Sequence, residues 1–166
     1  FLNSEKYFDG KRTELEELDF IPYEIIKPSH QDTLGHFGIN NWNQYFSDRQ
    51  VLVFSTFLKN IKKVCSNIED REYAKAISVC IGFLLCKHVN YNSLGSIWDR
   101  TTEGPKHTLT LRRPAFVYNH IEINPFSQVP GCMEYMLSNI KNSINFSSIR
   151  LFKIVSCIFP RSRAIE

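Results

Sequence analysis

Two helical patterns that follow each other closely constrain the fold of this chain more than any other feature. Apolar side chains recur at helical spacing from about Asp48 to Val64, so this segment is predicted to be a helix with one packing face. A second pattern, from about Glu69 to Val89, opens with acidic and closes with basic side chains, as the helix dipole favours. Only Ser66 to Ile68 separates them, so the two helices are predicted to be antiparallel neighbours.

The first of these helices has a clear start at Ser47. Its hydroxyl can accept from the free amides of the first turn, and Gln50 stands three residues on, as in a capping box. Arg49 and Gln50 are therefore held at a fixed helix start, where a guanidinium and an amide could contact phosphate or base edges. The alternative is that Arg49 pairs with a neighbouring carboxylate and Gln50 only caps.

The remaining segments predict a mainly α fold with a minor β element. A third helix is expected from Cys132 to Ser143, so the fold is an antiparallel helix pair plus a third helix and one or two short strands. Residues 90–106 are expected to form a loop. Strands are expected within Thr108 to Val117, where Pro114 limits pairing to a sheet edge, and over Ile149 to Phe159.

The chain divides into two parts by composition. Residues 1–32 are charged and turn-rich and are expected to be an arm with one short helix around Thr13 to Leu18, whereas residues 33–166 form a helical domain. With 166 residues, 43% hydrophobic and 13% aromatic, the chain is long and apolar enough for a real core. The longest apolar run, Ala74 to Cys86, is too short to cross a bilayer, and no secretory signal opens the chain, so a cytoplasmic protein without membrane contact is expected.

The five cysteines include no C-x-x-C pair, so no zinc site is predicted. An odd cysteine count without such spacing is typical of free thiols in a reducing compartment, most of them buried as small apolar side chains. His88, near the end of the second helix, is expected to be a cap that the helix dipole favours.

Charge is distributed unevenly. The net charge of +3 is modest, but carboxylates concentrate before residue 25 while basic side chains gather between Trp98 and Pro114. A basic loop with an aromatic nearby suits phosphate contact together with base stacking, and the alternative is an ordinary solvated loop. The candidate DNA-contacting residues are Arg49, Gln50, Arg100, Lys106, Arg112 and Arg113; the expected structural anchors are Trp42, Phe46 and Trp98.

Three blocks of this chain resemble one known family. The first block holds Phe37-Gly38, Trp42, Phe46, Arg49-Gln50 and Thr56-Phe57; the second holds Asn90-Tyr91-Asn92-Ser93-Leu94 with Trp98; the third holds Val117-Tyr118 and Glu122-Ile123-Asn124-Pro125-Phe126-Ser127. In this order and spacing they resemble the Y-G-x-x-x-W-x-x-x-F-x-x-R-Q, Y-N-S-S-L-x-x-W and V-W-D-x-x-E-x-N-P-F-S stretches of the large adenine-specific DNA methylases that contain a zinc ribbon. Phe37 and Tyr118 stand where that family has Tyr and Trp.

The resemblance implies an internal segment of a methylase dependent on S-adenosylmethionine, with DNA and the rest of the same polypeptide as partners. The catalytic N/D-P-P-Y/W loop and the Gly-rich cofactor turn are missing from these 166 residues. By this interpretation the chain has no catalytic residue, holds no cofactor and is inactive alone. The alternative, from another class, is a stand-alone helical module that binds nucleic acid or a protein partner.

Overall fold

The computed structural model describes residues 2–27, 34–108, 116–118 and 121–144. It is mainly helical, with one two-stranded antiparallel hairpin, which confirms the predicted fold class. The elements in chain order are α1 (Leu2–Glu17), η1 (Leu34–Phe37), η2 (Trp42–Tyr45), α2 (Asp48–Ser66), α3 (Arg71–Tyr91), β1 (Ile97–Asp99), β2 (Gly104–Lys106) and α4 (Met133–Ile144).

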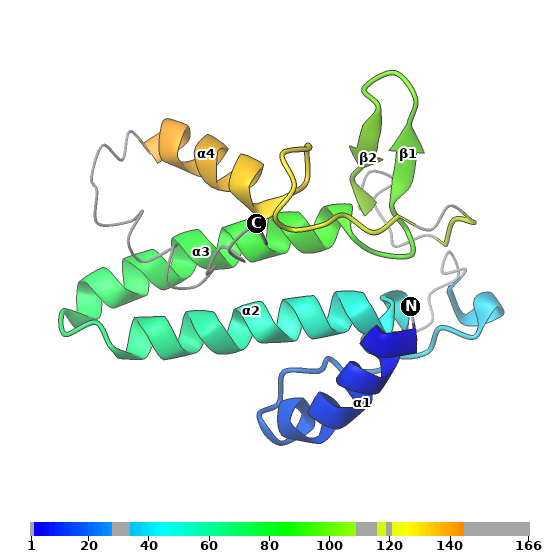
Figure 1. The fold of residues 1–166 in the computed structure, drawn as a ribbon, viewed down its shortest axis with the longest axis horizontal. Helices are drawn as coiled ribbons and strands as arrows, with labels where there is room; N and C mark the ends of the chain where they lie inside the picture. The colour runs from blue at the N-terminus through cyan, green and yellow to red at the C-terminus, as the bar shows by residue number, and fades with distance from the viewer. Residues whose placement is uncertain (1, 28–33, 109–115, 119–120, 145–166) are drawn as a thin grey trace.

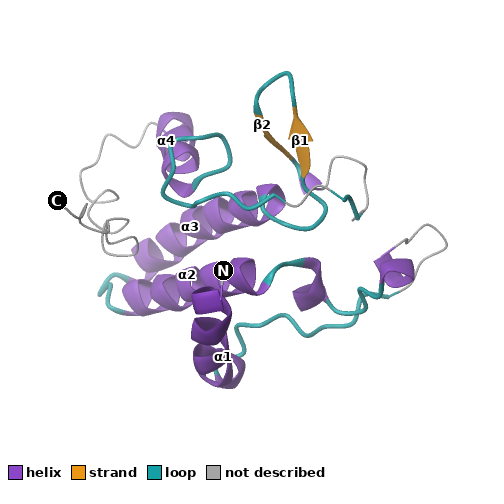
Figure 2. Ribbon diagram, turned by 45° about the vertical axis from the view of Figure 1, so that its right-hand side comes forward, coloured by secondary structure: helices purple, strands orange, loops and turns teal. Residues whose placement is uncertain are grey.

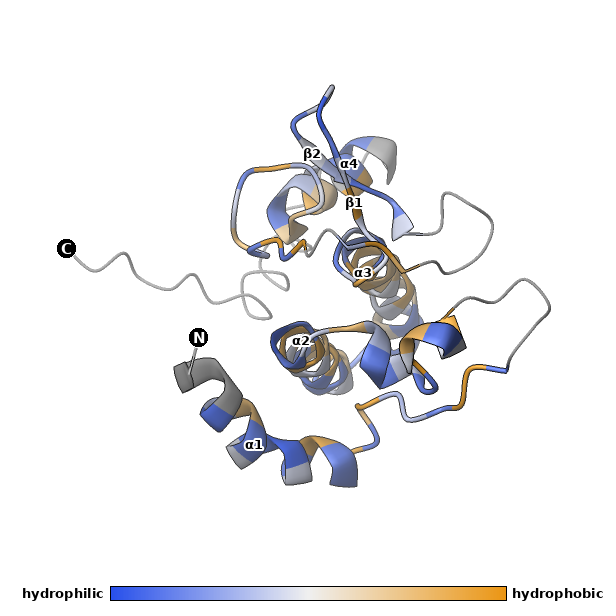
Figure 3. Ribbon diagram, turned by 90° about the vertical axis from the view of Figure 1, so that its right-hand side faces the viewer, coloured by the Kyte–Doolittle hydropathy of each residue, from blue (hydrophilic) through white to orange (hydrophobic). Residues whose placement is uncertain are grey.

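The four α-helices pack in series, each against the next. The antiparallel pair α2–α3 lies in the middle, with α1 against α2 and α4 against α3 (Figure 1). Figure 3, which looks along the central pair, places α1 and α4 on its opposite sides. The predicted pairing of the two long helices is therefore confirmed, and it gives the molecule two distinct ends.

We call the end that contains the α2–α3 connection the closed end. Its core is the buried cluster of Ile61, Ile77 and Ile81, which brings the last turns of α2 against the first half of α3. Asp70 caps α3 by accepting from the backbone amides of Glu72 and Tyr73, at 3.0 and 3.1 Å. This end therefore combines apolar packing between the two helices with a local cap.

Helix α1 is longer than the helix expected around Thr13 to Leu18. It begins at Leu2 and packs on α2 through Phe8 and Leu15, which are both only 3% exposed. These two side chains stand seven residues apart, two helical turns, so they lie on the same face of a helix that is otherwise polar. A face with so few apolar residues gives a weak periodic signal, which is why the sequence indicated only a short helix.

The hairpin β1–β2 lies where a loop was expected, so that prediction is wrong for residues 97–99 and 104–106. Ile97 pairs with Lys106 and Asp99 with Gly104, and the turn is held by the Asp99 carboxylate, which accepts from the amide of Thr101 at 3.0 Å. Figure 2 shows the hairpin standing off the helices beside the end of α3. Most of the strand expected within Thr108 to Val117, and all of Ile149 to Phe159, lies outside the described residues.

Candidate functional site at the open end of the helix pair

We call the opposite end of the helix pair the open end. It is formed by the start of α2 (residues 47–50), the end of α3 (residues 88–92) and the segment 121–126, which is bonded to both. The segment 116–118 lies at the same end, with Val117 bonded to Leu94 and Phe116 stacked on Phe37. The hairpin lies at the same end of the molecule (Figure 1). All the candidate DNA-contacting residues that the structure describes lie in or next to this region.

Gln50 is buried, with 3% of its surface exposed. Its Oε1 accepts from the amide of Ser47 at 3.0 Å, which completes the predicted capping box. Its Nε2 donates to Asn92 Oδ1 and to the carbonyl of Ile121, both at 3.0 Å. Because its amide is fully engaged inside the protein, Gln50 presents no free edge to a base.

Asn92 connects three segments of the open end. Besides Gln50, its Oδ1 accepts from the amide of Ile123 at 3.0 Å, and its Nδ2 donates to the carbonyl of the same residue at 3.3 Å. This pair of bonds aligns residues 121–123 against the end of α3. Asn92 is 3% exposed, so the bonds have no competition from water.

His88 continues this buried network. Its Nδ1 donates to the carbonyl of Gly131 at 2.8 Å, because a carbonyl can only accept, and its Nε2 then accepts from Asn92 Nδ2 at 3.3 Å. The side chain is fully buried, and burial lowers the pKa of His88 below its usual value. The expectation of a cap that the helix dipole favours is therefore wrong: His88 is a buried core residue bonded to Gly131 and Asn92.

Arg49 forms an ion pair with Glu122, which also accepts a hydrogen bond from the hydroxyl of Ser47. About a third of the Arg49 side chain and a quarter of the Glu122 side chain remain exposed. The pairing of Arg49 with a carboxylate is the alternative that the sequence left open. Asn124, two residues after Glu122, instead accepts from the amide of Phe126 at 3.0 Å and stabilises a turn.

The hairpin carries two of the candidate basic residues. Arg100 is exposed in the turn, and Lys106 forms an ion pair with Asp99 at 3.0 Å while about half of its side chain remains exposed. The amide of Thr101, and then Lys106, hold the pKa of Asp99 at about 2, so this carboxylate is charged at neutral pH. Arg112 and Arg113 lie outside the described residues.

The expected anchors occupy two different environments. Trp42 and Phe46 are half-buried, and each contacts the buried ring of Tyr45 edge to face, at centroid distances of 6.3 and 5.8 Å. Trp98 is 48% exposed on the hairpin, where it pairs with Pro105. A three-residue strand in a two-stranded hairpin has no second layer to bury it, so Trp98 is a surface residue and not a core anchor.

Sequence reasoning missed Asn92 and His88 as members of the buried network. Asn92 ends a long helix, where an Asn is usually taken as a local cap, and its partners outside that helix stand 31 to 42 residues away in the chain. A buried hydroxyl cluster was missed for the same reason: Thr108 Oγ1 contacts Ser93 Oγ at 2.7 Å and Ser96 Oγ at 3.0 Å. The only sequence signal for the buried network or for the hydroxyl cluster was the Asn92-Ser93 pair of the second block.

A groove of about 710 Å³ lies between α3 and α4. Its walls are largely apolar, with Phe83, Met136 and Ile140 among the lining residues, and Lys87 and Asn90 stand among its polar ones. Among the described residues no group of three or more His, Cys, Asp or Glu side chains could hold a metal ion. The groove therefore has the character of a contact surface and not of a metal centre.

No protein-family model, curated protein or solved structure matches this chain. None of the described helices is both long and apolar enough to span a membrane.

Proposed function

We propose that this chain is a helical segment of a cytoplasmic, S-adenosylmethionine-dependent DNA adenine N6-methyltransferase. Its role is to support the catalytic fold and to help position DNA. The cofactor and the methyl-transfer chemistry belong to the rest of the enzyme, so the segment alone is inactive.

The observation that carries this proposal is the convergence of the three sequence blocks on one network. Gln50 from the first block bonds Asn92 from the second, and Asn92 bonds the backbone of Ile123 in the third. Arg49 from the first block pairs with Glu122 from the third. Residues matched to a family by spacing alone have no reason to meet in space, whereas the parts of one structural unit do.

A second pair from different blocks meets as well. The ring of Phe37 lies 6.2 Å from that of Tyr118, edge to face. The family has Tyr and Trp at these two positions, so an aromatic contact of the same kind is possible there. This supports the proposal independently of the buried amides.

The network also divides the candidate residues by role. Gln50 stabilises the junction between segments and is left out of the DNA-contacting set. Arg49 is paired with Glu122 and keeps about a third of its side chain exposed, and Arg100 and Lys106 present positive charge from the hairpin at the same end of the molecule. Arg112 and Arg113 stay in the proposed set on their sequence position.

Duplex binding tests the DNA-positioning role. The chain should bind a labelled 20-base-pair duplex with an affinity that falls steeply with salt, measured by fluorescence anisotropy at several salt concentrations. The double variant R100Q/K106Q should bind more weakly and lower the log–log salt slope by up to about two, one for each phosphate that the variant no longer neutralises. The matched control is K63Q/K75Q, which removes two exposed lysines from the helices near the closed end. Equal weakening in both variants, or no binding at low salt, would contradict the DNA role.

The coding region on both sides of this chain tests the methylase assignment itself. A Gly-rich cofactor motif before Phe1 and a D-P-P-Y or N-P-P-Y run after Glu166 are expected. Calorimetric titration of the isolated chain with S-adenosylmethionine should show no binding. Neighbouring sequence that contains neither motif would remove the methylase assignment.

One observation favours the alternative of a stand-alone binding module. Phe83 and Tyr135, which line the groove between α3 and α4, are 64% and 46% exposed. Exposed aromatics beside a groove are typical of a surface that contacts another protein or another part of the same polypeptide. Duplex binding that shows no salt dependence, or none at all, would favour this alternative.

A further inference from the structure

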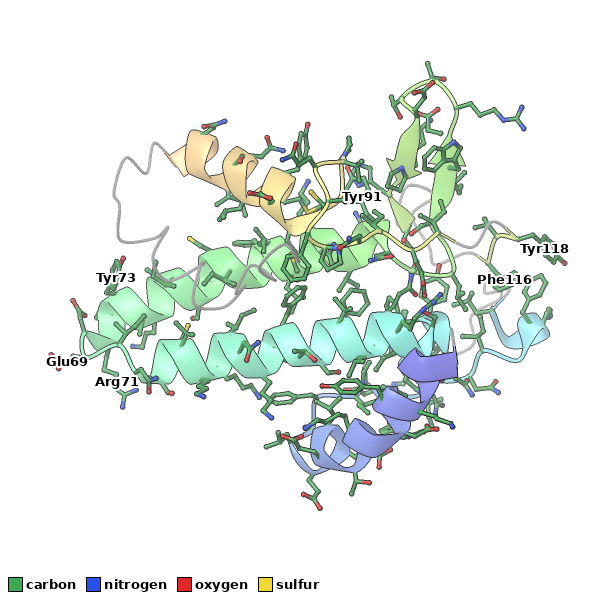
Figure 4. All side chains as sticks on the ribbon, in the orientation of Figure 1. Glu69, Arg71, Tyr73, Tyr91, Phe116 and Tyr118 are labelled. Carbon is green, nitrogen blue, oxygen red and sulfur yellow. The ribbon has the colours of Figure 1, made fainter. Side chains whose placement is uncertain are left out.

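Three aromatic side chains form a cluster at the surface of the open end. Phe37, at the end of η1, stacks on Phe116 with a centroid distance of 4.5 Å and an interplanar angle of 23°. Tyr118 meets both rings edge to face, at 6.2 Å from Phe37 and 5.5 Å from Phe116. In Figure 4 the labelled Phe116 and Tyr118 lie beside η1, at the same end of the molecule as the hairpin. We call these three residues the aromatic platform.

The platform is exposed but fixed in place. Tyr118 is 88% exposed and Phe37 is 46% exposed. Val117, which separates Phe116 from Tyr118 in the chain, donates its amide to the carbonyl of Leu94 at 3.3 Å. Phe116 also packs against the buried cluster that includes Leu34. The backbone next to Tyr118 is hydrogen-bonded, while no other described residue covers the Tyr118 ring. An exposed aromatic ring of this kind is suited to contact with a partner.

The size of the platform favours a small flat partner over a protein. An aromatic side chain buries about 150–250 Å², so three of them, already partly buried against each other, offer well under the ~800 Å² per partner of a stable protein interface. The face of one nucleobase is of the size that such a platform can cover. Stacking on an aromatic ring is also tolerant of base identity.

Partly exposed basic side chains at the open end can contact phosphate. Arg100 is exposed in the hairpin turn, and Lys106, paired with Asp99, keeps about half of its side chain exposed. The partly exposed Arg49 lies at the same end as the platform, so a phosphate backbone could pass the open end while a base reaches the rings.

We propose that the aromatic platform is a stacking site for an unpaired base of DNA, with Tyr118 as the outermost ring. This inference rests on the proposed function for the identity of the partner, DNA. It adds a preference for an unpaired base over paired duplex, which the proposed function does not require. The platform would hold a base that has left the duplex stack, while the basic groups hold the backbone on either side. Fully paired duplex would use only the basic groups.

The test compares two labelled 20-base-pair duplexes that differ only in one unpaired, bulged base at the centre. The chain should bind the bulged duplex at least roughly fivefold more tightly than the paired one, as expected for one stacked base. Tyr118→Ala should abolish this preference and leave paired-duplex affinity unchanged, whereas Tyr118→Trp should keep it. The matched control is Tyr135→Ala, an exposed tyrosine on α4 that should leave the preference intact. Circular dichroism melts of each variant establish that the fold is retained.

The outcomes separate this inference from the proposed function. Salt-dependent binding of paired duplex without any preference for the bulge, or a preference that survives Tyr118→Ala, would overturn the stacking site and leave the DNA role standing. Failure to bind either duplex would overturn both. If Tyr118→Ala instead abolished self-association seen by sedimentation, the platform would be a protein contact and the inference would be wrong.

Discussion

The two ends of the α2–α3 pair are built from different interactions. At the closed end, Ile61 packs against Ile77 and Ile81, and the connection between the helices is capped by neighbours within three residues. At the open end, bonds from Gln50 to Asn92 and from Ser47 to Glu122 join residues 42 and 75 positions apart. One end is held by apolar contacts and local caps, the other by buried hydrogen bonds between distant segments.

This difference predicts how each end tolerates change. Apolar packing is non-directional, so a slightly different side chain of similar volume is accommodated at small cost. A buried hydrogen-bond network is directional, and removal of one member leaves its partners unsatisfied away from water. Substitutions at the open end should therefore be the more damaging ones, although this end has the greater share of polar residues.

The largest effect is expected for Gly131→Ala, next to His88 of the open end. Gly131 has a φ of +94°, and an added Cβ would lie 2.7 Å from Ile123 Cδ1 and 3.1 Å from Tyr91 Cβ. Backbone strain and overpacking together should lower the free energy of unfolding by about 4 kcal/mol, measured by urea denaturation. The control is Gly82→Ala in the middle of α3, where nothing lies within 4 Å of an added Cβ. Gly82→Ala should raise the free energy of unfolding by up to about 1 kcal/mol. Equal effects of the two variants would contradict the prediction.

The next largest effect is expected for Asn92→Ala. It leaves Gln50 Nε2, His88 Nε2 and both backbone groups of Ile123 without this partner, and should cost on the order of 3 kcal/mol. Ile81→Val at the closed end removes one buried methylene and should cost about 1 kcal/mol. Urea denaturation of both variants measures the contrast. A smaller loss of stability for Asn92→Ala than for Ile81→Val would remove the distinction between the two ends.

The open end should also make stability dependent on pH. Because burial lowers the pKa of His88 in the fold, the unfolded chain takes up a proton first as pH falls below about 6.5. The contribution of His88 is thus complete above pH 6.5 and is lost as pH falls toward its folded pKa, at up to about 1.4 kcal/mol per pH unit.

Thermal melts between pH 5 and 7.5 measure this dependence, which His88→Gln should flatten. His107→Gln is the control, because His107, whose pKa is also lowered, is far less buried and should contribute less. The described carboxylates with a lowered pKa are the same in both variants, so they contribute equally to each pH dependence. An unchanged slope in His88→Gln would mean that His88 is not the group responsible.

The smallest contrast is between the two helix caps. Asp70→Ala at the closed end removes two hydrogen bonds to α3 amides and should cost about 1 kcal/mol. Ser47→Ala should cost somewhat more, because the Ser47 hydroxyl also donates to Glu122. The double variant Ser47→Ala/Glu122→Gln, compared with each single change by chemical denaturation, gives the coupling between them. No coupling would mean that Ser47 acts only as a local cap.

The fold class followed from periodicity, and the errors have identifiable causes. The three later helices were predicted within two residues of their ends, because caps such as Ser47 and Asp70 act through adjacent amides. The extent of α1 was missed because only Phe8 and Leu15 mark its buried face within the described part. The hairpin was missed because three-residue strands are too short for an alternating pattern to be recognised.

The sequence by itself determined the helix pair, its antiparallel arrangement and the capped start of α2, because these depend on residues within a few positions of each other. Only the tertiary structure decided what the candidate residues do. It buried Gln50 beside Asn92, paired Arg49 with Glu122 and left Trp98 at the surface. It also brought Phe37 to Phe116 and Tyr118. The reason is physical: a side chain's role depends on which distant groups share its surroundings, and spacing along the chain carries no information about them.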